Sequence, residues 1–131
     1  MTQLIDMHDY DSSHDPSMPV LEIGLSHILE VQPLTKVIAL VDSGSDVTTI
    51  PLKILQKVNA IRVGERYIVG VTGDRRLVRL YSVKIHIGSH SSYDIDAVAN
   101  TVNQETLLGR DILNQLEVTL NGFAGVTEIR V

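Results

Sequence analysis

The chain has 131 residues, of which 44% are apolar and only 4% are aromatic, and it contains no cysteine. A chain of this length is expected to form one domain, and the lack of cysteine excludes a disulfide framework and thiol chemistry. Its core must be built mostly from valine, isoleucine and leucine, and β-branched side chains favour strands. The net charge is −5 without a basic stripe, so we expect no nucleic-acid partner.

The N-terminal segment, residues 1–17, carries four aspartates and no lysine or arginine. Because it also contains serine and proline, its composition predicts a disordered acidic tail, followed by one folded domain over residues 18–131. Three of its side chains, His8, Asp11 and His14, are of metal-ligating types. A disordered segment has no rigid element to fix their geometry, so we favour a solvated tail and expect no metal.

The sequence shows no targeting or membrane-spanning pattern. The first ten residues lack the basic and then apolar order of a signal peptide. No apolar run approaches the length of a membrane span. We therefore expect a cytoplasmic protein without a membrane partner.

Strand patterns dominate the rest of the chain. Apolar runs and alternating residues predict strands over 19–25, 36–41, 47–50, 66–71, 76–87, 93–99, 117–120 and 126–131. A turn at 72–75 joins two of these strands into a hairpin, and an Asn-Gly turn joins the last two. Short helices are predicted over 51–58, which begins with a proline, and over 110–116. This order predicts an all-β fold, a small closed barrel-like domain with one short helix near its C-terminal end.

One strand, "KVIALV", runs directly into Asp42, which is followed by Ser43, Gly44 and Ser45. Gly44 allows a tight turn, and hydroxyls or amides beside Asp42 can hydrogen-bond to its carboxylate and keep it ionised. A carboxylate at the edge of a core is costly unless something uses it. The alternative is a strand-ending aspartate in an Asx turn, and these four residues by themselves favour that alternative.

A second motif, "LLGRD" at 107–111, places two leucines and a glycine before an Arg-Asp helix start. The hairpin around Gly73 lies between the two motifs. In this order the three features resemble the retropepsins, the single-domain aspartic proteases typified by retroviral protease. In that family an apolar strand leads into Asp-Thr/Ser-Gly, a mobile hairpin forms a flap, and two apolar residues and a glycine precede Arg with Asp or Asn.

The resemblance implies an aspartic endopeptidase that acts on peptides or proteins without a metal or cofactor. Asp42 would be the catalytic residue, in a catalytic motif completed by Ser43 and Gly44. Aspartic catalysis needs two carboxylates that share a proton, and the chain has only one Asp-Ser-Gly. We therefore expect a homodimer in which the two Asp42 side chains meet across a two-fold axis.

The resemblance also implies roles for the two serines. Ser43 replaces the threonine whose hydroxyl, in retroviral members, hydrogen-bonds across the dimer and fixes the catalytic loops. Ser45 occupies an Ala/Ser position. We expect its hydroxyl to favour the ionised form of Asp42, which would shift activity to lower pH than in Ser45→Ala.

Substrate contacts are expected from the flap tip and from apolar pockets near the motifs. Gly73 would be the flap tip, where a peptide approaches the backbone closely, although an ordinary exposed hairpin is the alternative. The residues expected to contact substrate are Ser45, Val47, Ile50, Val71, Thr72, Gly73, Asp74 and Leu108. Asp46 and Arg110 occupy the family positions of a structural ion pair, which we expect to be bidentate and partly buried.

Two other functions fit parts of the pattern. A retropepsin fold without catalysis would be a dimeric protein-interaction module, but the presence of Asp42, Ser43 and Gly44 favours the enzyme. A phosphatase with Asp-x-Asp after an apolar strand is excluded. Gly44 stands where its second aspartate would be, and the helices of an α/β fold are missing.

Overall fold

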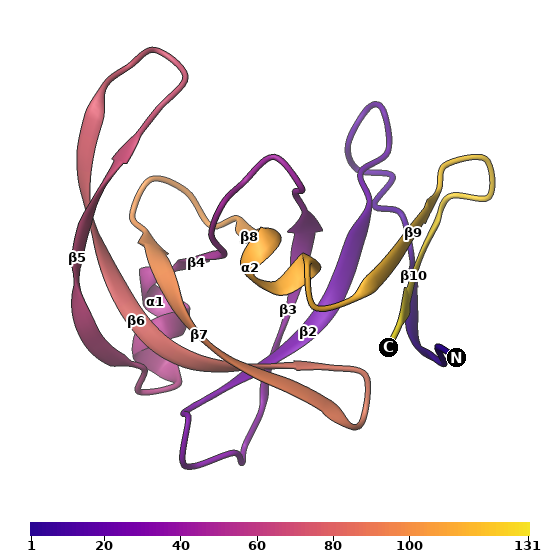
Figure 1. Cartoon of the computed structure of the whole chain (residues 1–131), viewed down its shortest axis with the longest axis horizontal. Coiled ribbons are helices and arrows are strands. Elements are labelled where there is room, and N and C mark those ends of the chain that lie inside the picture. Colours follow the sequence, from indigo (N-terminus) through magenta and orange to yellow (C-terminus); the bar gives the residue numbers. More distant parts are fainter.

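Strands dominate the structure, a computed structural model that describes all of residues 1–131. They include 53% of the residues, against 8% in helices, which confirms the predicted all-β class. Six strands form a closed barrel, because β6 pairs with β2 and completes the ring (Figure 1). In ring order they are β2 (Val20–Ser26), β3 (Thr35–Val41), β8 (Thr106–Leu108), β4 (Thr49–Pro51), β7 (Ser91–Asn100) and β6 (Arg75–Ile87).

The barrel core is aliphatic. Alternate residues on two long strands point inward and are at most 1% exposed: Leu21, Ile23 and Leu25 on β2, and Val83, Ile85 and Ile87 on β6. Successive side chains of a strand point to opposite faces, so the alternation that predicted these strands also fills the barrel. Burial of each such side chain contributes about 2 kcal/mol to folding.

Parallel pairing at the centre of the sheet brings the two sequence motifs together. β3 and β8 run parallel, with Val41 opposite Leu108. Parallel neighbours end at the same edge of a sheet, so the residues that follow β3 meet those that follow β8. β4 then pairs antiparallel with β8 and parallel with β7. The loop that starts at Asp42 therefore lies against the segment that starts at Gly109.

A long hairpin projects beyond the barrel. β5 (Ile61–Val69) pairs only with β6, whose first half it covers, while the second half of β6 belongs to the barrel (Figure 1). The strand predicted over 66–71 therefore begins earlier and ends earlier. Residues 70–74 form the turn, where the Gly70 amide donates to the Asp74 carbonyl at 3.0 Å.

Two short helices complete the barrel. α1 (Leu52–Lys57) buries Leu55, and α2 (Arg110–Leu113) buries Ile112 and Leu113. The second helix ends three residues before the predicted boundary. Neither helix has the length and apolar character needed to cross a membrane.

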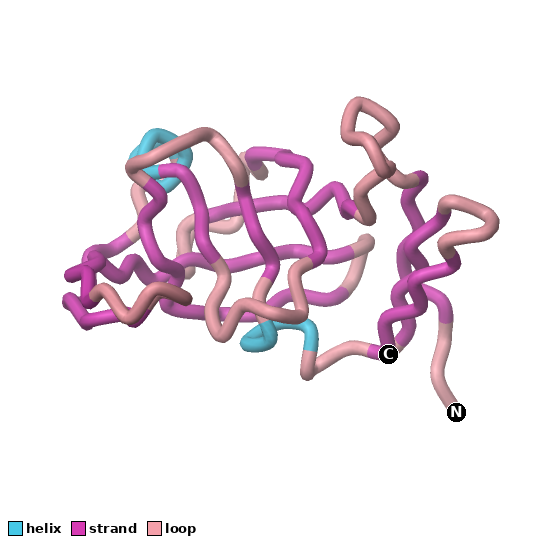
Figure 2. Tube along the Cα trace, turned by 90° about the horizontal axis from the view of Figure 1, so that it is seen from above, coloured by secondary structure: helices cyan, strands magenta, loops and turns pink.

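The prediction of a disordered N-terminal tail is wrong for its first part. Residues Leu4–Asp9 form strand β1, which pairs antiparallel with β10 (Val126–Arg130). Together with β9 (Glu117–Asn121), these strands make a second sheet beside the barrel, close to both chain ends (Figure 2).

The prediction of disorder was wrong because it was based on the total charge and composition of residues 1–17 and not on the pattern within residues 4–9. Within β1, Ile5 packs against the core and Asp6 is partly buried. Burial raises the pKa of the Asp6 carboxyl, an effect opposed by a hydrogen bond from the Met7 amide. The pairing partner of this strand lies more than 110 residues away at the other end of the chain, so no local pattern shows it.

Candidate active site

Asp42 lies at the edge of the barrel, half-buried, directly after β3. Its amide extends the β3–β8 ladder by donating to the Leu108 carbonyl at 3.0 Å. Its carboxylate oxygen Oδ1 accepts a hydrogen bond from the Gly44 amide at 3.0 Å. The second oxygen, Oδ2, has no hydrogen-bond partner in the chain. The Asx turn that the sequence offered as an alternative is therefore present, and it fixes the carboxylate with one oxygen free.

The expected hydrogen bond from Ser45 to Asp42 is wrong. The Ser45 hydroxyl donates instead to the carbonyl of Val47 at 2.8 Å, which tightens the loop behind the carboxylate. The Ser45 amide reaches the Asp42 carbonyl at 3.2 Å, a backbone contact that does not involve the carboxylate. The predicted acid shift relative to Ser45→Ala therefore loses its structural basis.

A buried polar cluster fixes the far end of the same loop. Asp111 accepts two hydrogen bonds from Thr48, one from its amide at 3.0 Å and one from its hydroxyl at 2.7 Å. The Thr48 hydroxyl in turn accepts a hydrogen bond from the Gly109 amide at 3.1 Å. Thr48 is completely buried, so each of these bonds replaces one that water would otherwise make.

The sequence did not assign this cluster a role. Asp111 belongs to "LLGRD", where the sequence predicts only a helix start. Thr48 was one of several β-branched residues in a predicted strand, and nothing in "VTTI" distinguishes the threonine that turns inward. Asp111 and Thr48 are more than 60 residues apart in the sequence. The cluster can therefore be recognised only when the fold shows that the two side chains are neighbours in space.

Arg110 holds the loop from outside. Its side chain forms an ion pair with Asp46, as expected. It is not bidentate on that carboxylate, because the other guanidinium nitrogen donates to the carbonyl of Ser43 at 2.7 Å. The side chains of Arg110 and Asp46 are 41% and 75% exposed in the single chain, so the expectation of a partly buried pair is wrong.

Gly109 is required by close packing. A Cβ atom at this position would lie 2.5 Å from the carbonyl carbon of Val47 and 2.6 Å from its oxygen, both backbone atoms. The glycine of "LLGRD" therefore lets the two motifs approach to van der Waals distance. The Arg110 amide uses this approach to donate to the Ser45 carbonyl at 2.9 Å.

A cleft of about 430 Å³ lies between this loop and the hairpin. Its walls are residues 44–47 of the loop and residues 66–69 of β5. Ser45 and Val47, two of the expected substrate contacts, are therefore placed in it. The expected tip residues, 71–74, do not line the cleft in the single chain.

Leu108 and Ile50 are not pocket residues, contrary to expectation. Both are fully buried in the barrel core. Leu107 instead lies opposite Leu40 and Thr49, and Leu40 is two residues before Asp42. Because alternate residues share a face, the partly exposed Leu107 lies on the same face as Asp42. The sequence predicted no strand over 106–108, so it gave no basis for telling which of the two adjacent leucines is buried.

The hairpin tip has the turn geometry that the sequence predicted. Gly73 has φ +84°, in the left-handed region, and its amide donates to the Gly70 carbonyl at 3.0 Å. Nothing lies within 4 Å of a Cβ built there, so in the single chain the turn conformation explains this glycine. Thr72 donates to the Asp74 carboxylate at 3.1 Å, and Val71 is fully exposed.

The N-terminal metal-ligating side chains do not gather around one point. His14 lies 3.8 Å from the carboxylate of Asp11, while His8 is hydrogen-bonded to the carbonyl of Asp9 at 2.6 Å. No three histidine, aspartate or glutamate side chains in residues 1–131 are arranged to hold a metal ion.

Sequence comparison matches residues 16–121 to the family described as retroviral aspartyl protease. This match spans most of the chain and includes both motifs and the hairpin between them. The chain therefore belongs to the retroviral aspartyl protease family, and the resemblance drawn from its sequence is confirmed. A comparison with curated protein sequences gave no match.

The fold is similar to the crystal structure of a retropepsin-like aspartic protease from Rickettsia conorii. The TM-score is 0.64, and the similarity covers 99% of this chain and 92% of that one. The two sequences are only 10% identical, so this likeness concerns the fold. It confirms the predicted retropepsin fold.

Proposed function

We propose that this protein is an aspartic endopeptidase that works as a homodimer with one Asp42 from each subunit. The observation that carries the proposal is the fixed Asp42 carboxylate, which has one free oxygen and stands on a loop that forms the wall of a cleft. A single Asp-Ser-Gly motif supplies half of the required pair, and a two-fold axis supplies the other half.

The chemistry follows from the closeness of two like charges. Two adjacent carboxylates cannot both ionise easily, so one Asp42 keeps a proton while the other is a carboxylate. The carboxylate takes a proton from a water molecule, which attacks the peptide carbonyl carbon. The protonated Asp42 donates a hydrogen bond to the developing oxyanion, and a proton passes to the leaving nitrogen as the C–N bond breaks.

The remaining residues position this pair. Arg110, Asp111 and Thr48 fix the loop from behind, and we propose that the Ser43 hydroxyl acts at the contact between the two loops. The hairpin of residues 61–82 would close over a bound peptide as a flap, with Gly73 at its tip. Product release would then require the hairpin to open.

The test is Asp42→Asn, assayed for cleavage of a mixed peptide library with and without a pepstatin-type inhibitor. We expect a loss on the order of 10³-fold, because the substitution removes general acid–base catalysis while preserving shape. Asp96→Asn is the matched control, since Asp96 is an exposed carboxylate on β7 without an ion pair. Cleavage that persists in Asp42→Asn would refute the mechanism. Wild-type protein that cleaves nothing would support the dimeric interaction module instead.

A mixed dimer tests whether one site needs both subunits. Wild-type and Asp42→Asn chains carrying different affinity tags are co-expressed, and the heterodimer is purified through both tags. We expect it to be as inactive as the homodimer of Asp42→Asn chains, because every site then lacks one carboxyl. Half of the wild-type activity would show that each Asp42 acts alone. Sedimentation at the assay concentration measures the dimer itself.

A further inference from the structure

The hairpin of residues 61–82 carries a net positive charge, spread over both of its faces, although the protein is acidic. It contains five of the seven arginines of the chain and only two acidic residues, Glu65 and Asp74, which gives it a net charge of +3. The net charge of the whole chain is −5, so the remainder carries −8. Positive charge is thus concentrated on the element that lies over the candidate active site.

Two of these arginines face the barrel. Arg66 pairs with Val78 across the hairpin, and Ile68 pairs with Arg76. Residues directly opposite each other on paired strands lie on the same face, as do residues two apart on one strand. Val78 is 6% exposed and Ile68 is half-buried, so this face is the one turned toward the barrel. On this face Ile68 and Val78 form an apolar pair, and Arg66 and Arg76 lie diagonally opposite each other on the two strands.

Three of the five hairpin arginines, Arg66, Arg76 and Arg79, have no partner in the chain, and of these only Arg66 and Arg76 lie on the face turned toward the barrel. Arg62 forms an ion pair with Glu65, and Arg75 on the outer face stacks over the ring of Tyr67 at 4.6 Å. Arg66 and Arg76 make no ion pair and no side-chain hydrogen bond anywhere in the chain. A guanidinium group without a partner beside a cleft is available to an anionic ligand.

Each of the two arginines lines a cavity. Arg66 lines the cleft of about 430 Å³, opposite the loop that follows Asp42. The only acidic side chain in that wall is Asp46, which is already paired with Arg110.

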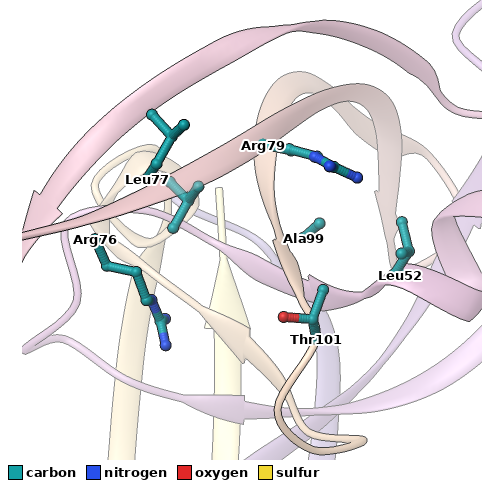
Figure 3. A pocket seen from close by; sticks show the side chains of 7 residues that line it. Leu52, Arg76, Leu77, Arg79, Ala99 and Thr101 are labelled. Carbon is teal, nitrogen blue, oxygen red and sulfur yellow. The ribbon is translucent and has the colours of Figure 1, made fainter.

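Arg76 lines a second cavity of about 310 Å³, where the hairpin leaves the barrel. Figure 3 shows Arg76 on β6 together with Arg79, near Thr101 and the apolar side chains of Leu52 and Ala99. The walls of this cavity contain two guanidinium groups and no carboxylate.

We propose that Arg66 and Arg76 make the protein select peptides that carry acidic side chains on either side of the cleaved bond. This inference rests on the proposed peptidase function and names its substrate class. A peptide extended under the hairpin meets an apolar centre at Ile68, with a guanidinium to each side. Glutamate or aspartate side chains reaching those positions form charge-assisted hydrogen bonds that glutamine cannot match.

The kinetic test uses one peptide scaffold with Glu, Gln or Lys at each position that flanks the cleaved bond. At the preferred positions we expect kcat/KM to be about tenfold higher for Glu than for Gln, and lowest for Lys. Arg66→Gln and Arg76→Gln should each reduce the Glu-to-Gln ratio about threefold, the usual size of an exposed ion pair. Added salt should compress the ratio, and so should a pH below about 4, where the peptide glutamate is protonated.

Arg75→Gln is the matched control, because it removes the same charge from the outer face of the same hairpin. It should leave the Glu-to-Gln ratio unchanged. Equal kcat/KM for the Glu and Gln peptides at every position in the wild type would overturn the proposal. It would equally be overturned if Arg75→Gln lowered the ratio as much as Arg66→Gln and Arg76→Gln do.

A binding measurement separates this proposal from the proposed catalysis. Fluorescent Glu and Gln peptides are titrated into the Asp42→Asn protein, and anisotropy gives Kd. Tighter binding of the Glu peptide, lost in Arg66→Gln and Arg76→Gln, supports the acidic preference whether or not the wild type cleaves anything. Equal affinity for the two peptides, or no binding of either, overturns it. In that case cleavage lost only in Asp42→Asn would still support the peptidase.

Discussion

The loop of residues 42–48 and the hairpin of residues 61–82 are held in different ways. The loop is fixed by hydrogen bonds to a segment more than 60 residues downstream. The hairpin projects beyond the barrel and is held by the pairing of its own two strands. The loop is reached by both oxygens of Asp111, by the guanidinium of Arg110 and by the amide of Gly109. The tip of the hairpin is exposed on all sides.

This difference separates two requirements of the proposed chemistry. A carboxylate that must meet its partner across a dimer axis needs a fixed backbone, and a buried polar cluster supplies it. An element that must admit and release a peptide has to open, so it is drawn from the part of the fold with few buried contacts. Substitutions in the loop should therefore lower global stability, while those in the hairpin should change substrate binding.

The largest effect is expected for Gly109→Ala. The new Cβ would lie 2.5 Å from backbone atoms of Val47, which cannot yield as a flexible side chain can. We expect a loss of about 3 kcal/mol in the free energy of unfolding, with loss of activity. Urea denaturation measures it, and Gly122→Ala, in a turn with open space, is the control. If Gly109→Ala lowered the free energy of unfolding no more than Gly122→Ala does, the two motifs would not be tightly packed.

Thr48→Val should have the next largest effect. Valine has the same shape but leaves Asp111 and the Gly109 amide without the hydroxyl that bonds to both. We expect a cost of about 2 kcal/mol, because buried polar groups are left unsatisfied. Thr119→Val, on an exposed strand position, is the matched control and should be nearly neutral in thermal unfolding. Equal melting temperatures for the two variants would contradict a fixed loop.

Arg110→Gln should cost less in stability than it does in activity. The ion pair with Asp46 is largely exposed, so it contributes at most about 1 kcal/mol in the monomer. Its second bond, to the Ser43 carbonyl, positions the residue next to Asp42. We therefore expect a clear fall in kcat and in dimer affinity at nearly unchanged thermal stability. A large fall in melting temperature with unchanged kcat would show that Arg110 stabilises the fold and does not position the residue next to Asp42.

Gly73→Ala tests the hairpin side of the comparison. The position has φ +84°, which costs a residue with a Cβ about 1 kcal/mol. The strain falls on the exposed turn, so hydrogen exchange of the 66–79 amides should accelerate and KM should rise. Global unfolding should barely change. A melting temperature lowered as much as by Thr48→Val would mean that the hairpin is part of the cooperative core.

The smallest effect is a pH dependence at His86, which lies on β6 outside both regions. Burial lowers the pKa of His86 below 6.5, Lys84 adds to this, and Asp94 opposes it. The unfolded chain therefore binds this proton first, so the stabilising contribution is complete above about pH 6.5 and is lost as pH falls through the folded-state pKa.

The difference in melting temperature between wild type and His86→Gln checks the pH dependence at His86. Glutamine can keep a hydrogen bond to the buried hydroxyl of Ser26, which lies 2.9 Å from His86 Nε2. We expect the advantage of the wild type to shrink between pH 7 and pH 5. A difference that stays constant over that range would contradict the direction of the shift.

Local sequence patterns predicted those parts of the fold that depend on alternation and turn residues. The barrel strands other than β8 and the hairpin turn belong to this group. The meeting of the Asp42 loop with "LLGRD" was implied by the family resemblance, through the ion pair of Asp46 and Arg110. Whether a strand residue points into the core or toward the surface depends on which strands pair and in which register, and no local pattern contains that information. In β8 a shift of one residue separates the buried Leu108 from Leu107 on the Asp42 face.

Hydrogen-bond partners were the least predictable part of the candidate site. Ser45 stands three residues after Asp42, yet its hydroxyl bonds forward to Val47. Thr48 and Asp111 form the central buried bond of the loop across 63 positions of sequence. Such partners are fixed only when β3 and β8 lie side by side.

The strand made by Leu4–Asp9 has a practical consequence for anyone who shortens this protein. Composition suggests cutting at residue 18, which would remove one strand of a three-stranded sheet and leave one side of β10 without its backbone partners. It would also uncover Gly88, whose vacant Cβ position lies 2.5 Å from the Ile5 carbonyl oxygen. An affinity tag joined at residue 1 lies only three residues before strand β1, so a spacer should separate the tag from that strand.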